Sequence, residues 1–211
     1  MIIQMLTIAL FALLAAASPG PDFAVVARHA LAGRRYPAVA VSLGIATGLV
    51  VHSTYCVLGL AAVITHSLWM LSVIKLLGAG YLMYLGVKSW RASASSLLMA
   101  PDMSVHNSIA ASFREGFLVN MLNPKCAFFM MSIFTLVVRP HTSLFLQSVF
   151  ALEIVLITLF WFVFLSFTLT LEAVQRKMQF MHRSVMRTMA SLLCLLGVSV
   201  VFEWLGSVAL L

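Results

Sequence analysis

The sequence has very little charge. Of its 211 residues only 9% are charged and only six are acidic, whereas 63% are hydrophobic. A soluble domain of this length needs a polar exterior, and this chain has too few polar residues to build one. The composition therefore predicts a single membrane-embedded domain over residues 1–211, and no segment is long and polar enough to form a second domain.

Cysteine is also scarce. The three cysteines lie far apart in apolar runs with no histidine at ligand spacing, so neither disulfides nor a metal site are expected. The net charge of +7 does not indicate nucleic-acid binding, because the basic residues flank apolar runs and form no patch. This pattern favours lipid phosphates and the cytoplasm as partners. The first apolar run lacks the basic n-region of a signal peptide and is interpreted as a membrane segment.

Apolar runs long enough to cross a membrane as helices, about 20 residues each, occur six times. They cover residues 2–27, 37–65, 68–90, 114–138, 144–170 and 189–211. The expected fold is an all-α membrane protein with six transmembrane helices. Ten of the 13 basic residues fall in or beside the first, third and fifth loops, and only Arg139 falls on the opposite side. Basic loops stay cytoplasmic, so both termini are expected on the outer side of the membrane.

Two of these runs are interrupted by proline. Residues 18–22 read Ser-Pro-Gly-Pro-Asp, and residues 123–125 read Asn-Pro-Lys. A broken helix persists at membrane depth only against protein or a wet cavity. After each break a helix can begin again with proline in its first position, and its N-terminus favours an anion such as a substrate carboxylate. The alternative is a purely structural kink.

The charged residues at these breaks are Asp22 and Lys125. A charge inside the membrane is costly and usually marks a transport path. We expect Asp22 to neutralise Lys125 until a substrate carboxylate replaces it; the alternative is a permanent salt bridge that only joins the helices. The predicted substrate-binding residues are Gly20, Pro21, Asp22, Asn123, Pro124 and Lys125.

Three further charges fall within the runs. Glu153 lies well inside residues 144–170, where desolvation favours the protonated carboxyl group. Glu153 and Asp22 are therefore the candidates for carrying a coupling proton. Lys75 is an ion-pair candidate for Glu153, although its side chain can instead extend to the interface. Glu203 is closer to the outer end and is expected to reach water.

The two breaks occupy corresponding positions in two halves, about residues 1–91 and 108–211. Each half has three helices, and an odd number forces the second half to insert upside down. Two inverted repeats with broken first helices predict a binding site at their interface. Both breaks lie nearer the cytoplasmic ends of their apolar runs, however, whereas strict inversion would place them at opposite depths. Gly44 and Gly48 form a G-x-x-x-G face suited to close helix packing.

Three segments together resemble the lysine exporter and homoserine/threonine exporter (LysE/RhtB) family. They are residues 18–22, residues 74–86 (Ile-Lys-Leu-Leu-Gly-Ala-Gly-Tyr-Leu-Met-Tyr-Leu-Gly) and residues 116–125 (Gly-Phe-Leu-Val-Asn-Met-Leu-Asn-Pro-Lys). The resemblance implies bacterial amino-acid efflux driven by the proton motive force, often by homodimers. Residues 132–136 lack the Pro-Gln-Phe that many members carry, which is closer to the threonine-exporter branch.

The sequence thus predicts a secondary transporter, not an enzyme, that exports threonine, homoserine or related small polar metabolites by proton antiport, with no cofactor. An intramembrane enzyme is disfavoured because the adjacent His52 and Ser53 point to different faces of a helix. A structural or assembly protein would not need charged, broken helices. Efflux of a substrate other than an amino acid is a further alternative.

Overall fold

The computed structural model describes residues 2–18, 20–66, 108–138 and 142–171, and isolated positions at 73–87 and 174–202. The regular structure in these ranges is helical and consists of α1 (Ile2–Ala17), α2 (Pro21–Leu31), α3 (Arg35–His66), α6 (Ile109–Met121), α7 (Pro124–Val137) and α8 (Leu144–Thr168). Most of the third and sixth expected helices lies outside the described residues, as do Lys75 and Glu203.

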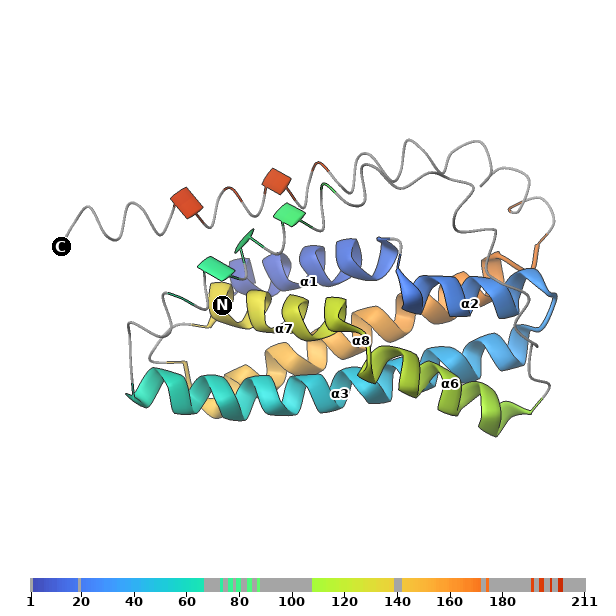
Figure 1. The fold of residues 1–211 in the computed structure, drawn as a ribbon, viewed down its shortest axis with the longest axis horizontal. Helices are drawn as coiled ribbons and strands as arrows, with labels where there is room; N and C mark the ends of the chain where they lie inside the picture. Colours follow the sequence, from blue (N-terminus) through green and yellow to red (C-terminus); the bar gives the residue numbers. More distant parts are fainter. Residues whose placement is uncertain are drawn as a thin grey trace.

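Two unbroken helices run the length of the bundle (Figure 1). α3 and α8 confirm the helices expected over residues 37–65 and 144–170. Each contains a candidate membrane span by length and composition, Arg35–Gly59 in α3 and Leu144–Thr168 in α8. The outer face of α8 exposes Leu152, Leu156 and Phe160, as expected of a helix that faces lipid.

The other two spans are bent at the predicted breaks. The axes of α1 and α2 differ by 61°, and those of α6 and α7 by 58°. With each bent pair counted as one span, the described residues contain up to four candidate spans. All four are helical, as the composition predicts for a membrane domain.

The breaks lie closer to the middle of their helices than expected from the apolar runs. α2 continues to Leu31 and α6 begins at Ile109. At 1.5 Å per residue, about 16 Å of helix follows the first break and about 20 Å precedes the second. The predicted boundaries at residues 27 and 114 were therefore wrong. α2 continues through Arg28 and His29 because both pair with Glu115 of α6. α6 begins earlier because Ser108 is its N-cap and accepts a hydrogen bond from the backbone N–H of Ala111.

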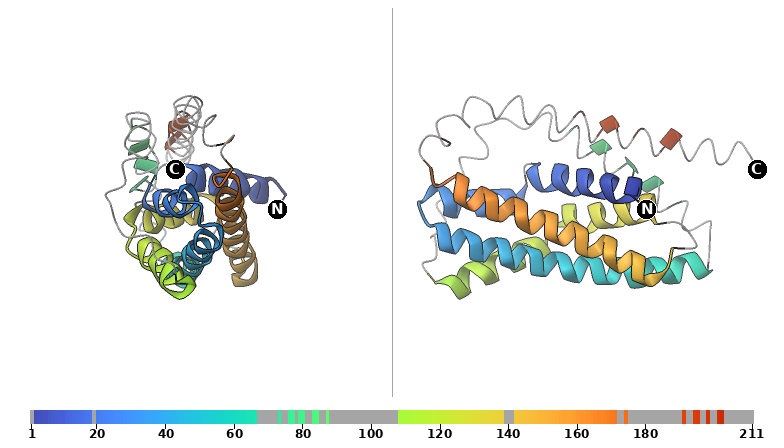
Figure 2. Two further views of the ribbon diagram at one scale, coloured as in Figure 1. Left: turned by 90° about the vertical axis from the view of Figure 1, so that its right-hand side faces the viewer. Right: turned by 180° about the vertical axis from the view of Figure 1, so that it is seen from behind.

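The two bent helices run in opposite directions. α1 lies beside α7, and α2 lies beside α6, so that the two breaks meet (Figure 1). Figure 2 shows the same bundle end-on and from behind. The two bent helices are thus antiparallel, and α1 packs on α7 where α2 packs on α6.

The core consists of two apolar clusters on either side of the breaks. One joins α1, α3, α7 and the first half of α8 around Met130, Phe134 and Phe150. The other joins α2, the start of α3 and the second half of α8 around Val26 and Phe162. The layer between the two clusters contains the breaks and most of their polar side chains.

Glycine allows α3 and α6 to cross at very short range. A Cβ atom on Gly44 would lie 2.1 Å from the carbonyl oxygen of Phe113, and one on Gly116 would lie 2.1 Å from that of Val41. No side chain fits at either position unless the helices separate. The close-packing face predicted at Gly44 and Gly48 is confirmed, with α6 as its partner.

Candidate functional site

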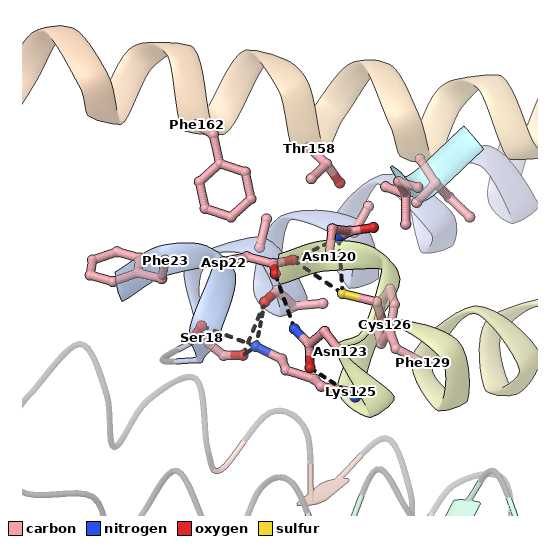
Figure 3. Close-up of a pocket in the computed structure, with 15 residues that line it drawn as sticks. Ser18, Asp22, Phe23, Asn120, Asn123, Lys125, Cys126, Phe129, Thr158 and Phe162 are labelled. Carbon is pink, nitrogen blue, oxygen red and sulfur yellow. Dashed lines mark hydrogen bonds between the residues drawn. The ribbon is translucent and has the colours of Figure 1, made fainter. Parts of the chain in front are cut away.

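The carboxylate of Asp22 lies at the centre of the layer where the breaks meet. Asp22 is in the first turn of α2 and is only 8% exposed. Its oxygens accept hydrogen bonds from the side-chain amides of Asn120 (2.8 Å) and Asn123 (3.1 Å) and from the thiol of Cys126 (3.1 Å; Figure 3). A carboxylate at a helix N-terminus is also stabilised by the helix dipole.

The ammonium group of Lys125 points toward the end of α1. It donates hydrogen bonds to the carbonyl oxygens of Ala15 (3.0 Å) and Ser18 (3.1 Å), and to the hydroxyl of Ser18. A cation here neutralises the carbonyl end of α1. Lys125 and Asp22 thus lie at one site, as predicted, but the hydrogen bonds recorded for each go to different groups.

The predicted restart of the helix after Pro124 is confirmed. Asn123 is the N-cap of α7, and its Oδ1 accepts a hydrogen bond from the backbone N–H of Lys125 (3.0 Å). At the first break Pro21 opens α2, and Gly20 has extended backbone (φ 176°) and not a left-handed turn. The absence of a side chain at Gly20 matters for space, because a Cβ there would lie 3.3 Å from the Nζ atom of Lys125.

A histidine of α3 pairs with the end of α6. The Nε2 atom of His52 lies 3.1 Å from the carbonyl oxygen of Asn120, and its Nδ1 atom pairs with the hydroxyl of Tyr55. The Oδ1 atom of Asn120 is buried, has no recorded hydrogen-bond partner, and would lie 2.7 Å from a Cβ on Gly48. Gly48 therefore leaves the space that the Asn120 side chain needs to face Asp22.

The helices enclose a cavity of about 30 Å³ beside these groups. Its polar wall comes from α2, α6 and α7, and α1, α3 and α8 form the apolar wall. The polar wall consists of Asp22, Asn120, Asn123, Lys125 and Cys126, and Thr158 and Phe162 of α8 lie across from it (Figure 3). The remaining lining includes Ala12, Ala15, Ala16, Leu49 and Ile154. This volume holds one or two waters, so an amino acid enters only if the walls move apart.

The remaining predicted site residues have different positions. Gly20, Pro21 and Pro124 shape the helix ends. Glu153 lies on α8 next to Ile154, which lines the cavity, but adjacent helical residues face different directions. Its side chain is partly buried, and its Oε2 atom has no recorded hydrogen-bond partner.

Three residues that bind the charged groups were not predicted as site residues from the sequence: Ser18, Asn120 and Cys126. Asn120 carried a signal, because it lies three residues before Asn123 and both amides fall within an apolar run. The thiol of Cys126 carried none, since free cysteines are common in apolar surroundings.

A second polar cluster was also missed. The carboxylate of Glu115 in α6 pairs with Arg28 of α2 through one oxygen and with Nε2 of His29 through the other, at 2.9 Å. The side chain of His29 is fully buried, and those of Arg28 and Glu115 are about 15% exposed. Arg28 was interpreted as a loop residue and Glu115 was overlooked, because both fall at the edges of apolar runs.

Bent apolar helices that meet around buried charges define a helical membrane protein with a polar centre. The sequence matches the LysE type translocator family over residues 13–203, so the chain belongs to this family. The resemblance drawn from the three motifs is confirmed. Membership of a family of translocators also indicates a transporter and not an enzyme.

Several curated proteins are similar over most of the chain. The threonine efflux protein of Escherichia coli is 30% identical over 182 residues, which cover 85% of this chain and 88% of that protein. The E. coli membrane protein YahN is 28% identical over 186 residues, which cover 88% of this chain and 83% of that protein. A homoserine/homoserine lactone efflux protein of Salmonella typhimurium is 32% identical over 104 residues, which cover 49% of this chain and 50% of that protein. No solved structure matches the chain.

Proposed function

We propose that the protein exports a small, uncharged-side-chain amino acid such as threonine or homoserine, or a related small polar metabolite. The observation that carries this proposal is the presence of a carboxylate, Asp22, and an ammonium group, Lys125, on the walls of one cavity. A zwitterion needs one group of each sign a few ångströms apart. The names of the similar threonine and homoserine efflux proteins favour the same substrate class.

In the proposed complex the substrate ammonium binds the Asp22 carboxylate. It replaces one of the amide or thiol donors that Asp22 holds at 2.8–3.1 Å. The substrate carboxylate binds Lys125, in competition with the carbonyl oxygens of Ala15 and Ser18. Charge-assisted hydrogen bonds of this kind are stronger than those they replace, which favours the exchange.

The apolar wall suits a small side chain. Thr158 offers a hydroxyl group between Ile154 and Phe162, and these three residues lie four apart on one face of α8. A hydroxylated side chain the size of threonine or homoserine fits this combination of one polar group and two apolar ones. A charged side chain would find no partner of opposite sign among these three residues.

The proposed transport cycle alternates access around this site. The cavity is too small for substrate, so α2 and α6 swing about the breaks relative to α1 and α7. We place the protein in the bacterial inner membrane as two inverted repeats of three helices, with both termini outside and a homodimer as a possible assembly. Proton antiport drives export, with Asp22 and Glu153 as proton carriers: the substrate ammonium displaces a proton from Asp22.

Counterflow in proteoliposomes tests the proposal. Purified protein is reconstituted into vesicles loaded with unlabelled threonine, and uptake of radiolabelled threonine is measured. We expect exchange by the wild type and at least about a tenfold weaker apparent affinity in Asp22→Asn, because hydrogen bonds to a charge are worth about 1.5–3 kcal/mol. The matched control is Gly59→Ala, where an added Cβ meets nothing within 4 Å.

Two results contradict this function. Absence of exchange for threonine, homoserine and other small amino acids, with folded protein, would favour the structural or assembly alternative or a different substrate. Unchanged affinity in Asp22→Asn would remove the carboxylate from the binding site and leave it a structural role.

A further inference from the structure

His29 is a buried titratable residue that the proposed cycle does not yet use. It is fully buried and lies on α2 seven residues after Asp22. Residues seven apart lie on the same face of a helix, so His29 and Asp22 face α6 from the same side of α2, about 10 Å apart along the axis. Asp22 contacts Asn120 of α6, and His29 contacts Glu115 of α6.

These two contacts join the halves of the bent helices that extend away from α1 and α7. The pair α2–α6 therefore has a polar contact at the cavity and a second one further along, where Glu115 binds both His29 and Arg28. Separation of α2 from α6 would open the cavity in this direction. Any group that changes the strength of the second contact would control that opening.

We propose that His29 is a proton-carrying residue of the transport cycle, and that its protonation holds α2 against α6. This inference rests on the proposed function, since a proton-coupled exporter needs a group that binds and releases a proton. Histidine is the side chain that titrates near neutral pH, and a bond to a carboxylate is the usual way to hold it. The proton is taken up at an imidazole nitrogen and released to water, with no other bond changed.

The strength of the contact follows the charge of His29. The neutral imidazole donates its Nε2–H to Glu115, whereas the imidazolium adds the attraction of opposite charges at 2.9 Å. Proton release toward the α2–α6 end weakens the contact and lets the cavity open there, where the deprotonated protein loads substrate. After substrate has left on the opposite side, His29 takes up a proton there and holds α2 against α6 until the proton is released again, so that one proton moves against the substrate in each cycle.

Other charged groups around His29 are mostly cations. Arg28 shares Glu115 with it, Arg34 donates its backbone N–H to the carbonyl of His29, and Arg114 is exposed on α6. The side chain of Arg35 lies over the ring of Phe167 and reaches Thr170, and its neighbour Tyr36 is exposed. α1 has no charged residue, and in α8 the charged residue is Glu153. Glu115 is thus the carboxylate that pairs with both His29 and Arg28.

The first experiment separates coupling from binding. Wild type and His29→Gln are compared in proteoliposomes for threonine exchange at equal pH and for uphill transport driven by a pH gradient. We expect His29→Gln to keep exchange and to lose uphill transport. We also expect the exchange rate to change with pH between about 5 and 8 in the wild type and to be independent of pH in His29→Gln. Glu115→Gln is expected to alter the same pH profile.

The second experiment needs no substrate. Spin labels are introduced with noncanonical amino acids at positions 32 and 110. Both positions are exposed and lie at the ends of α2 and α6 that are farthest from the breaks, so the labels report the distance between these helices. We expect a shorter and narrower distance distribution at pH 5 than at pH 8 in the wild type, and one pH-independent distribution in His29→Gln. If the wild type exchanges no amino acid, this measurement still tests the inference and only the proposed function fails.

Three results overturn the inference. The first is uphill transport by His29→Gln with the wild-type pH profile. The second is loss of exchange together with uphill transport in a folded variant, which would assign His29 to binding or to structure. The third is a wild-type distance that does not depend on pH. If His29→Gln does not fold, Glu115→Gln decides: an unchanged pH profile in that variant contradicts the proposal.

Discussion

The ammonium group of Lys125 in α7 lies 3.0 Å from the carbonyl oxygen of Ala15 in the last turn of α1. The cation of the second break thus satisfies the helix end left by the first, and the anion of the first break, Asp22, accepts hydrogen bonds from Asn123 at the start of α7. Each break compensates the other. In a membrane, where water cannot pair with free backbone groups, this exchange explains how two broken helices are stable together.

Removal of the Lys125 charge should therefore destabilise the first break. In Lys125→Met a side chain of similar length leaves the carbonyl oxygen of Ser18 without the ammonium donor and that of Ala15 with the hydroxyl of Ser18 alone. A buried group left unsatisfied costs about 1–3 kcal/mol, so we expect a lower midpoint of thermal unfolding in detergent and loss of export. Lys125→Arg keeps the charge and should lose less stability. Equal unfolding midpoints for all three proteins would show that the contact with α1 contributes nothing.

The glycine crossing of α3 and α6 predicts a sharp positional contrast. In Gly44→Ala the new Cβ meets the backbone of α6 at 2.1 Å, and the helices must separate. Overpacking of this kind costs about 1–3 kcal/mol and should also shift Asn120 away from Asp22. Gly59→Ala on the same helix meets nothing within 4 Å and serves as the matched control. Thermal unfolding and exchange assays check both variants, and equal behaviour would contradict the crossing geometry.

Glu153 tests the second candidate for proton coupling. Glu153→Gln keeps the size of the side chain and removes its proton-binding carboxylate. We expect exchange of unlabelled for labelled substrate to continue and uphill efflux driven by a pH gradient to be abolished. Leu152→Ala, which truncates an exposed neighbour on α8, controls for the disturbance of the helix. Normal uphill efflux by Glu153→Gln removes this residue from the mechanism.

The distribution of basic residues predicts the orientation of the chain. Ten basic residues on one side against one on the other place both termini outside the cytoplasm. A reporter enzyme fused after Leu211 should therefore be active only if it requires the periplasm, and a reporter that requires the cytoplasm should be inactive. A fusion with the reverse pattern would overturn the map of six spans.

The unbroken helices could be predicted closely, whereas the ends of the broken ones could not. Both ends of α3 and both ends of α8 fall within two residues of the ends of the predicted runs. α2 extends four residues beyond its predicted run, because that run ends before the first charged residue, Arg28, whereas the helix continues through Arg28, which pairs with Glu115 of α6. α6 begins five residues before its predicted run, because Ser108 caps the helix ahead of the uncharged residues 109–113.

The sequence by itself determined the membrane setting, the two breaks, the residues that begin each new helix and the family. These features depend on composition and on contacts between near neighbours, such as the capping of Lys125 N–H by Asn123 two residues away. Only the tertiary structure decided which groups Asp22 and Lys125 bind. Their partners Asn120 and Ala15 lie 98 and 110 residues away in the chain, and the crossing of the helices brings them together. Charge made Asp22 and Lys125 the expected pair, but Asp22 accepts its hydrogen bonds from side chains of α6 and α7 and of the break between them, and Lys125 donates its hydrogen bonds to the carbonyl end of α1.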